Sequence, residues 1–178
     1  MRATRNSQSK RGEYESLMRT FETTRHVAHS AEDMFSLVAD IERYPEFVPL
    51  CKALNLRGRE EKDGHEVLTA DMTVAYKLFH ETFASRVTLD RDTPQILVEY
   101  LDGPFTHLEN RWNFRDTGEG TSDIEFYLEY EFRSRSMQML MGAMFDQAFG
   151  KFAQAFEQRA DIVYGRDKDA ETAPGVST

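Results

Sequence analysis

The sequence contains a single cysteine, Cys51, among its 178 residues. One cysteine excludes a disulfide framework and a cysteine zinc site within the chain, and it favours a reducing compartment. No stretch reaches the roughly 18 consecutive apolar residues that a transmembrane helix needs. The first residues also lack the apolar segment of a secretory signal. These absences predict a protein that neither spans a membrane nor depends on disulfides.

Recognisable catalytic and metal-binding patterns are also missing. There is no G-x-S-x-G elbow, no phosphate-binding P-loop and no G-x-G-x-x-G fingerprint. The five histidines show no H-E-x-x-H or comparable metal-ligand spacing. Cys51 follows an apolar loop, which favours inert burial over a nucleophilic role. Catalytic signals in the sequence are therefore thin, and the patterns predict no catalytic residue and no metal site.

The charge is unevenly distributed. The net charge is −9, while residues 1–17 carry a small excess of positive charge, so the rest of the chain is more acidic than the total. An acidic body repels phosphate backbones. We therefore expect no DNA partner, although a small local basic patch is compatible with this composition.

Length and composition predict one domain with short ends. Hydrophobic residues make up 40% and charged residues 30% of the chain, as in a globular protein. Residues 1–18 show no apolar periodicity and are predicted to be a disordered leader. They fit either a weak mitochondrial transit peptide or a stretch upstream of a true start at Met18. Residues 19–165 form the predicted domain, and 166–178 a loose tail.

Alternating apolar and polar residues dominate the domain. The clearest strand is 124–132, where Ile124, Phe126 and Leu128 share one side with two further aromatic residues and glutamates lie on the other. Similar alternation predicts about six more strands near 21–27, 54–59, 65–76, 83–89, 96–100 and 105–114. One wet and one buried face, with hairpin-length turns between, indicate an antiparallel sheet.

Two segments have a helical period instead. Ser30 is a candidate N-cap for a short amphipathic helix, and Ser134 or Ser136 can cap a long one that ends near Tyr164. One stripe of apolar side chains runs along the long helix, at Met141, Phe145, Phe149, Phe152 and Phe156. Core packing is the simplest interpretation of the stripe. A curved sheet around such a helix would also leave a hollow lined by the same side chains. The predicted fold class is α+β.

The segment 41–51, I-E-R-Y-P-E-F-V-P-L-C, is unusually apolar for a connection. Pro45 and Pro49 exclude both a long helix and a central strand. A proline-stiffened apolar loop ahead of a series of strands fits the lid of a cavity. It equally fits a short helical turn that plugs the end of an ordinary core.

Residues 102–105, D-G-P-F, form a second distinctive connection. Gly103 permits an unusual backbone angle and Pro104 restricts the next one, so Phe105 is held in one direction. Two interpretations are open. Phe105 caps the core at a hairpin corner, or it forms a second lip that faces the segment 41–51.

Three motifs together resemble the coenzyme Q-binding protein family of START-like (polyketide cyclase/dehydrase) domains. They are L-V-A-D-I-E-R-Y-P-E-F-V-P-L-C at 37–51, D-G-P-F-x-x-L-x-x-x-W-x-F at 102–114 and A-F-x-x-R-A at 155–160. The resemblance covers roughly residues 19–165. It implies a helix-grip fold, in which a curved antiparallel sheet of about seven strands wraps around a long C-terminal helix. Members of this family commonly have Trp where this chain has Leu50.

The resemblance further implies a non-enzymatic protein that binds ubiquinone or a related polyisoprenoid lipid and supports respiratory electron transport. Ubiquinone would be a bound ligand, with no other cofactor. Transient contact with a membrane surface is expected, at the bacterial inner membrane from the cytoplasm or at the matrix side of the mitochondrial inner membrane. The ribosome association toxin resembles the same segments, so a ribosome-binding role stays open. That role needs a basic patch, for which the candidates are Arg57, Arg59, Lys62 and Arg86.

We expect the ligand to contact two groups of side chains. The predicted gate consists of Tyr44, Phe47, Val48, Pro49, Leu50 and Phe105. The predicted wall consists of Met72, Val74, Phe83, Trp112, Phe114, Met141, Phe145, Phe149 and Phe152. An aromatase or cyclase would instead need paired polar groups deep in the hollow, and the sequence does not place His107, Arg111 and Asp71 together.

Overall fold

A computed structural model describes residues 17–165. The elements are β1 (Arg19–Val27), α1 (Ala31–Ala39), the 3₁₀ helix η1 (Ile41–Glu46), β2 (Cys51–Lys62), β3 (His65–Tyr76), β4 (Phe79–Asp90), β5 (Gln95–Asp102), β6 (Phe105–Gly118), β7 (Thr121–Phe132) and α2 (Arg135–Tyr164). Almost all of the predicted leader, and the whole of the predicted tail, lie outside the described residues.

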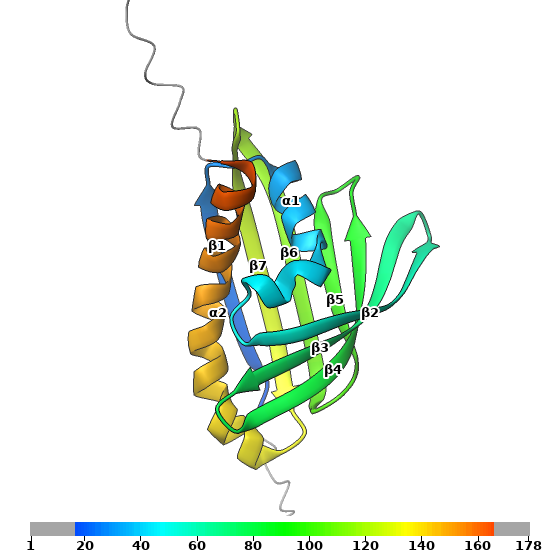
Figure 1. Cartoon of the computed structure of the whole chain (residues 1–178), viewed down its shortest axis with the longest axis vertical. Helices are drawn as coiled ribbons and strands as arrows, with labels where there is room; N and C mark the ends of the chain where they lie inside the picture. The colour runs from blue at the N-terminus through cyan, green and yellow to red at the C-terminus, as the bar shows by residue number, and fades with distance from the viewer. Residues whose placement is uncertain (1–16, 166–178) are drawn as a thin grey trace, which may run out of the picture.

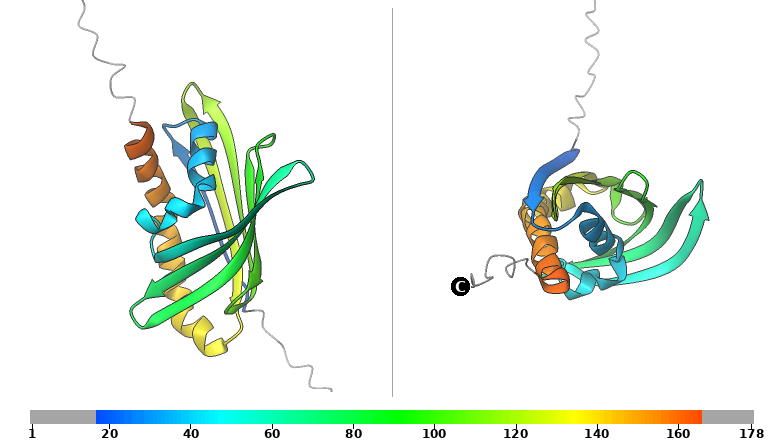
Figure 2. Two further views of the ribbon diagram at one scale, coloured as in Figure 1. Left: turned by 45° about the vertical axis from the view of Figure 1, so that its right-hand side comes forward. Right: turned by 90° about the horizontal axis from the view of Figure 1, so that it is seen from above.

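The seven strands form one antiparallel sheet in the order β1-β7-β6-β5-β4-β3-β2. The sheet curves strongly, and α2 runs along its open side (Figure 1). Seen from above, the strands surround α1 while α2 and η1 close the remaining side (Figure 2). The prediction of a curved antiparallel sheet with a long C-terminal helix is confirmed.

Serine caps define where both helices begin. The Ser30 hydroxyl accepts a hydrogen bond of 3.1 Å from the Asp33 amide at the start of α1. Of the two candidates at the start of α2, Ser134 is the N-cap, and its hydroxyl accepts from the Met137 amide at 3.4 Å. Such caps satisfy amides that have no partner inside the helix.

The corner at 102–105 turns the chain inward. Gly103 has φ of 138°, and a Cβ there would lie 2.7 Å from the Cβ of Phe83, so only glycine fits. Phe105 is 1% exposed and stacks on Phe132 with ring centroids 4.7 Å apart. The interpretation of Phe105 as an outer lip is therefore wrong, because the turn drives this ring into the core.

Candidate functional site

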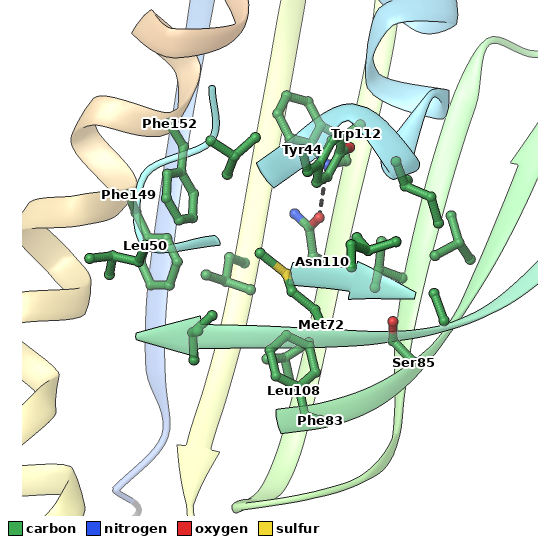
Figure 3. Close-up of a pocket in the computed structure, with 18 of the residues that line it drawn as sticks. Tyr44, Leu50, Met72, Phe83, Ser85, Leu108, Asn110, Trp112, Phe149 and Phe152 are labelled. Atoms are coloured by element: carbon green, nitrogen blue, oxygen red, sulfur yellow. Dashed lines mark hydrogen bonds between the residues drawn. The ribbon is translucent and has the colours of Figure 1, made fainter. Parts of the chain in front are cut away.

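An apolar cavity of about 120 Å³ lies between the concave face of the sheet, η1 and α2. Its lining comes from strands β2 to β7, from the segment 41–51 and from one face of α2 (Figure 3). The lining residues are Ile41, Tyr44, Val48, Leu50, Leu54, Ala70, Met72, Val74, Phe83, Ser85, Val87, Ile96, Val98, Phe105, Leu108, Asn110, Trp112, Phe126, Leu128, Phe145, Phe149, Phe152 and Phe156.

Most of the predicted ligand-contacting residues meet in this cavity. Those in the lining are Tyr44, Val48, Leu50, Met72, Val74, Phe83, Phe105, Trp112, Phe145, Phe149 and Phe152. They come from segments far apart in the chain, and the curvature of the sheet brings them onto one surface. That they contact a ligand stays a prediction.

Four predicted residues lie outside the lining, and packing explains three of them. Phe47 turns onto Phe156, with ring centroids 5.1 Å apart, and covers the cavity from outside. Phe114 lies under α1 against Phe35, at 5.5 Å, because this end of β6 supports that helix. Met141 is buried on α2 before the stripe reaches the cavity. Pro49 is half-buried beside Leu50 and does not line the cavity.

The sequence analysis missed much of the wall on β5 and β6. Ile96, Val98 and Leu108 line the cavity together with Ser85 and Asn110. Strand alternation placed Ile96 and Val98 on one face, but only the sheet order shows which strands surround the hollow. Alternation along 83–89 placed Ser85 on one face with Phe83 and Val87, whereas Asn110 carried no sequence signal, because a single polar position on an inner face resembles a break in the pattern.

The segment 41–51 forms both a helical turn and the rim of the cavity. Its first part is η1, with Pro45 inside, and Tyr44 donates a hydrogen bond of 2.5 Å from its hydroxyl to the Val38 carbonyl. Burial raises the pKa of Tyr44. Leu50 has φ of 65°, an angle that costs a leucine of order 1 kcal/mol or more. The two sequence interpretations, plug and rim, thus describe parts of one segment.

Polar atoms in the cavity are few and uncharged. Asn110 donates from Nδ2 to the Tyr127 carbonyl and accepts at Oδ1 from the Trp112 indole N–H, both at 2.8 Å (Figure 3). The other polar groups among the lining residues are the hydroxyls of Ser85, on β4, and of Tyr44. No charged side chain of the described residues lines the cavity, so it suits a neutral, mostly apolar molecule.

The polar residues considered for catalysis lie elsewhere. His107 pairs with Glu129 at 2.8 Å, Asp71 pairs with Arg57, and Arg111 lies over the Tyr127 ring at 4.3 Å. None of the three lines the cavity. Within residues 17–165, no group of histidine, cysteine or acidic side chains could hold a metal ion.

The candidate basic patch is largely paired with acids. Arg57 bonds Asp71 twice at 2.6 Å, and Arg59 bonds Glu66. Arg86 lies 4.0 Å from Glu99. These pairings reduce the positive field that the patch would present to RNA.

A model of the family "Polyketide cyclase / dehydrase and lipid transport" matches residues 27–157. The chain belongs to this family. The match spans α1, η1, strands β2 to β7 and most of α2, so it includes all residues that line the cavity.

Relatives with two different names cover most of the chain. The ribosome association toxin RatA of Vibrio cholerae is 36% identical over 141 residues, which are 78% of this chain and 93% of that protein. The mitochondrial coenzyme Q-binding protein coq10 of Schizosaccharomyces pombe is 25% identical over 155 residues, 85% of this chain and 92% of that protein.

Solved structures share the fold. An 18 kDa protein of Caulobacter crescentus is 31% identical with a TM-score of 0.69, covering 83% of this chain and 99% of its own. A START superfamily protein of Mycobacterium smegmatis has 25% identity and a TM-score of 0.66, with 81% and 98% coverage. The Zhui aromatase/cyclase of Streptomyces also reaches 0.69, over 89% and 99%, but at 19% identity it shows the fold alone. The START-like, helix-grip fold is confirmed.

Proposed function

We propose that this protein binds ubiquinone or a related polyisoprenoid lipid in the cavity and carries it without chemical change, in support of respiratory electron transport. The observation that carries the proposal is the enclosed hollow of phenylalanine, leucine, valine and methionine side chains with no charged lining. The relative named coenzyme Q-binding protein supports the same ligand class.

The free energy of apolar burial favours such a ligand. Each buried methylene contributes about 0.8 kcal/mol, so an isoprenoid tail gains affinity without precisely placed polar contacts. Met72 and the rings of α2 provide an adaptable surface for a flexible chain. A charged metabolite would lose its hydration in this cavity and find no ion-pair partner among the lining residues.

The cavity volume limits what enters without a structural change. Cavities of about 100–150 Å³ accept a single aromatic ring, and this one measures about 120 Å³. A long tail must therefore extend through the rim. Tyr44, Leu50 and Phe152 are half-buried lining residues that belong to the segment 41–51 and to α2. We propose that the ring of the ligand lies inside and that its tail leaves between the segment 41–51 and α2.

Exposed apolar side chains near the start of α2 suit contact with a membrane surface. Leu78, at the tip of the β3–β4 hairpin, is fully exposed, as is most of Met139 and Leu140. The rings of Phe79 and Phe145 pack edge to face with centroids 6.3 Å apart, and this contact links the hairpin to α2 (Figures 1 and 2). No helix of the described residues is long and apolar enough to cross a membrane. We propose transient contact with the inner membrane through this end, from the bacterial cytoplasm or the mitochondrial matrix.

Lipid extraction followed by mass spectrometry tests the proposal. Protein purified from its native host should carry an isoprenoid quinone or a related lipid, and ligand-free protein should take up ubiquinone from vesicles. Trp112 is the only tryptophan and lines the cavity, so quinone binding should quench its fluorescence. Repeated recovery of no isoprenoid, together with no uptake, would exclude the carrier function.

A ribosome-binding role is the second candidate, because the identity to the RatA relative exceeds that to coq10. Co-sedimentation with large ribosomal subunits tests it. Replacing Arg57 and Arg59 by Glu should abolish binding if these side chains exchange their acidic partners for RNA phosphates. Binding that survives both substitutions would place any ribosome contact on another surface.

A further inference from the structure

The deep end of the cavity presents a hydroxyl that has no partner. Ser85 is 5% exposed, lines the cavity from β4, and makes no hydrogen bond through its side chain with any residue in 17–165. Its oxygen points from β4 toward the hollow (Figure 3). Unlike the fully enclosed Tyr100 hydroxyl, the Ser85 oxygen stays reachable from the cavity, so it is free to donate a hydrogen bond to a bound ligand.

The register partner of Ser85 also carries an unsatisfied hydroxyl. Tyr100 pairs with Ser85 in the β4–β5 register, so both side chains are on the inner face. The Tyr100 hydroxyl is enclosed and has no hydrogen-bond partner. Its ring packs on Phe105, which lines the cavity, at 5.8 Å. Tyr100 itself does not line the cavity, so its unpartnered hydroxyl lies behind the cavity wall and Ser85 carries the hydroxyl that faces a ligand from β4.

Asn110 provides a second, fixed donor on the same face of the sheet as Ser85, two strands away. Its two printed bonds, to Trp112 and to the Tyr127 carbonyl, hold the amide in one orientation and leave one N–H free. Asn110 pairs with Val98 on β5, which in turn pairs with Val87, two residues from Ser85 on β4. Since β5 lies between β4 and β6, the two backbones are about 10 Å apart, twice the usual strand spacing.

We infer that Ser85 and Asn110 form a headgroup site that donates hydrogen bonds to the oxygens of a neutral quinone ring. A six-membered ring with oxygens at opposite positions, and one hydrogen bond at each end, matches the separation of β4 and β6. Both residues are donors toward carbonyl oxygen, and neither carries charge, which selects a ketone over a carboxylate or phosphate. The ring enters first, and the tail points toward Leu50 and Phe152. This inference rests on the proposed function and adds the polar recognition that apolar burial cannot supply.

Two ligands with the same tail separate ring recognition from apolar binding. Decylubiquinone has the ring oxygens, whereas decylbenzene lacks them. Calorimetric titration of the full chain should show that Ser85→Ala weakens decylubiquinone binding about 3- to 10-fold, the worth of one neutral hydrogen bond. The same substitution should leave decylbenzene affinity within about twofold. Val87→Ala, a neighbouring apolar wall position, is the matched control and should weaken both ligands alike.

The unliganded protein gives an independent readout. Because the Ser85 hydroxyl has no partner, Ser85→Ala should leave the urea midpoint unchanged or raise it. A marked loss of stability would show that the hydroxyl is structural and would overturn the inference. Decylubiquinone binding that is insensitive to Ser85→Ala would also overturn it while leaving the carrier function intact. If wild-type protein bound neither ligand, the carrier function itself would fail, and this headgroup site with it.

Discussion

Leu50 combines backbone strain with a position at the cavity rim. Its left-handed φ of 65° is held in place because its carbonyl accepts a 3.0 Å hydrogen bond from the Ala75 amide. Strain of this kind is retained where a side chain must point in a particular direction. Here the leucine side chain faces the cavity instead of solvent.

Replacing Leu50 by Gly should therefore separate the backbone strain at this position from the apolar cover that the side chain gives the cavity. Relief of the left-handed angle offsets the lost apolar contact, so we expect the free energy of unfolding to change by no more than about 1 kcal/mol. Quinone release, followed by recovery of Trp112 fluorescence, should become several-fold faster. Leu50→Asn tolerates the same angle and removes the same apolar cover, so it should release quinone at a similar rate. Unchanged release in both variants would mean that Leu50 does not gate the cavity.

Cys51, next to the rim, illustrates how burial controls reactivity. The thiol is buried at the start of β2, and desolvation raises its pKa from 9.0 to about 11. A two-unit shift lowers the thiolate fraction at pH 8 about 100-fold, since only the thiolate is nucleophilic. We expect slow iodoacetamide labelling of the folded protein that accelerates as the pH rises toward 11, and fast labelling in denaturing urea. Equal rates in folded and unfolded protein would contradict a buried thiol.

Helix α2 carries two glycines whose environments differ. A Cβ added at Gly142 would lie 2.7 Å from Nε of Arg19, which also forms an ion pair with Asp146 at 2.6 Å. At Gly150, nothing lies within 4 Å of the added atom. Close packing thus explains the first glycine, and nothing in the structure explains the second.

Gly150→Ala should stabilise the protein by about 1 kcal/mol, the difference in helix propensity between these residues. Urea unfolding measures the gain. Gly142→Ala is the matched control, because displacement of the Arg19 guanidinium should cancel part or all of the same propensity gain. A lower free energy of unfolding for Gly150→Ala would contradict this prediction and would indicate that α2 needs backbone freedom at this position.

Local patterns predicted these elements well, because alternation and serine caps are properties of neighbouring residues. Strand 65–76 and the start of the long helix agree with β3 and α2 within a residue. The residues that line the cavity were harder to predict, since the lining depends on which strands become neighbours and on how far the sheet curves. Phe114 shares the inner face with Trp112 but lies under α1, and no sequence period distinguishes these two positions. The positions of Ser85 and Asn110 in the cavity emerged only from the assembled sheet.

Both ends of α2 present apolar side chains to solvent, but only the first end lies beside the β3–β4 hairpin (Figure 1). Leu78, Met139 and Leu140 form an apolar end near the start of α2, with Lys77 beside the hairpin tip. The far end of α2, which lies away from this hairpin (Figure 1), also exposes apolar side chains, namely Ile162, Val163 and Tyr164. If the first end contacts membranes, charge placed there should matter more than equal charge at the second.

Leu78→Asp should accordingly slow ubiquinone transfer between vesicles several-fold, because a carboxylate at the hairpin tip opposes insertion among lipid headgroups. Stability should be unchanged, since the side chain is fully exposed. Ile162→Asp adds the same charge at the opposite end of α2 and should leave the transfer rate unaltered. Transfer can be followed by the quench of a fluorescent lipid probe in acceptor vesicles.

Equal slowing by both variants would contradict a specific contact at the hairpin tip. It would instead show an effect of the net charge, which is −9 in the unchanged protein, because a more acidic protein is repelled by an anionic surface whichever end approaches it. Repeating the comparison with zwitterionic vesicles removes that repulsion, and a defect of Leu78→Asp that persists there belongs to the hairpin tip itself.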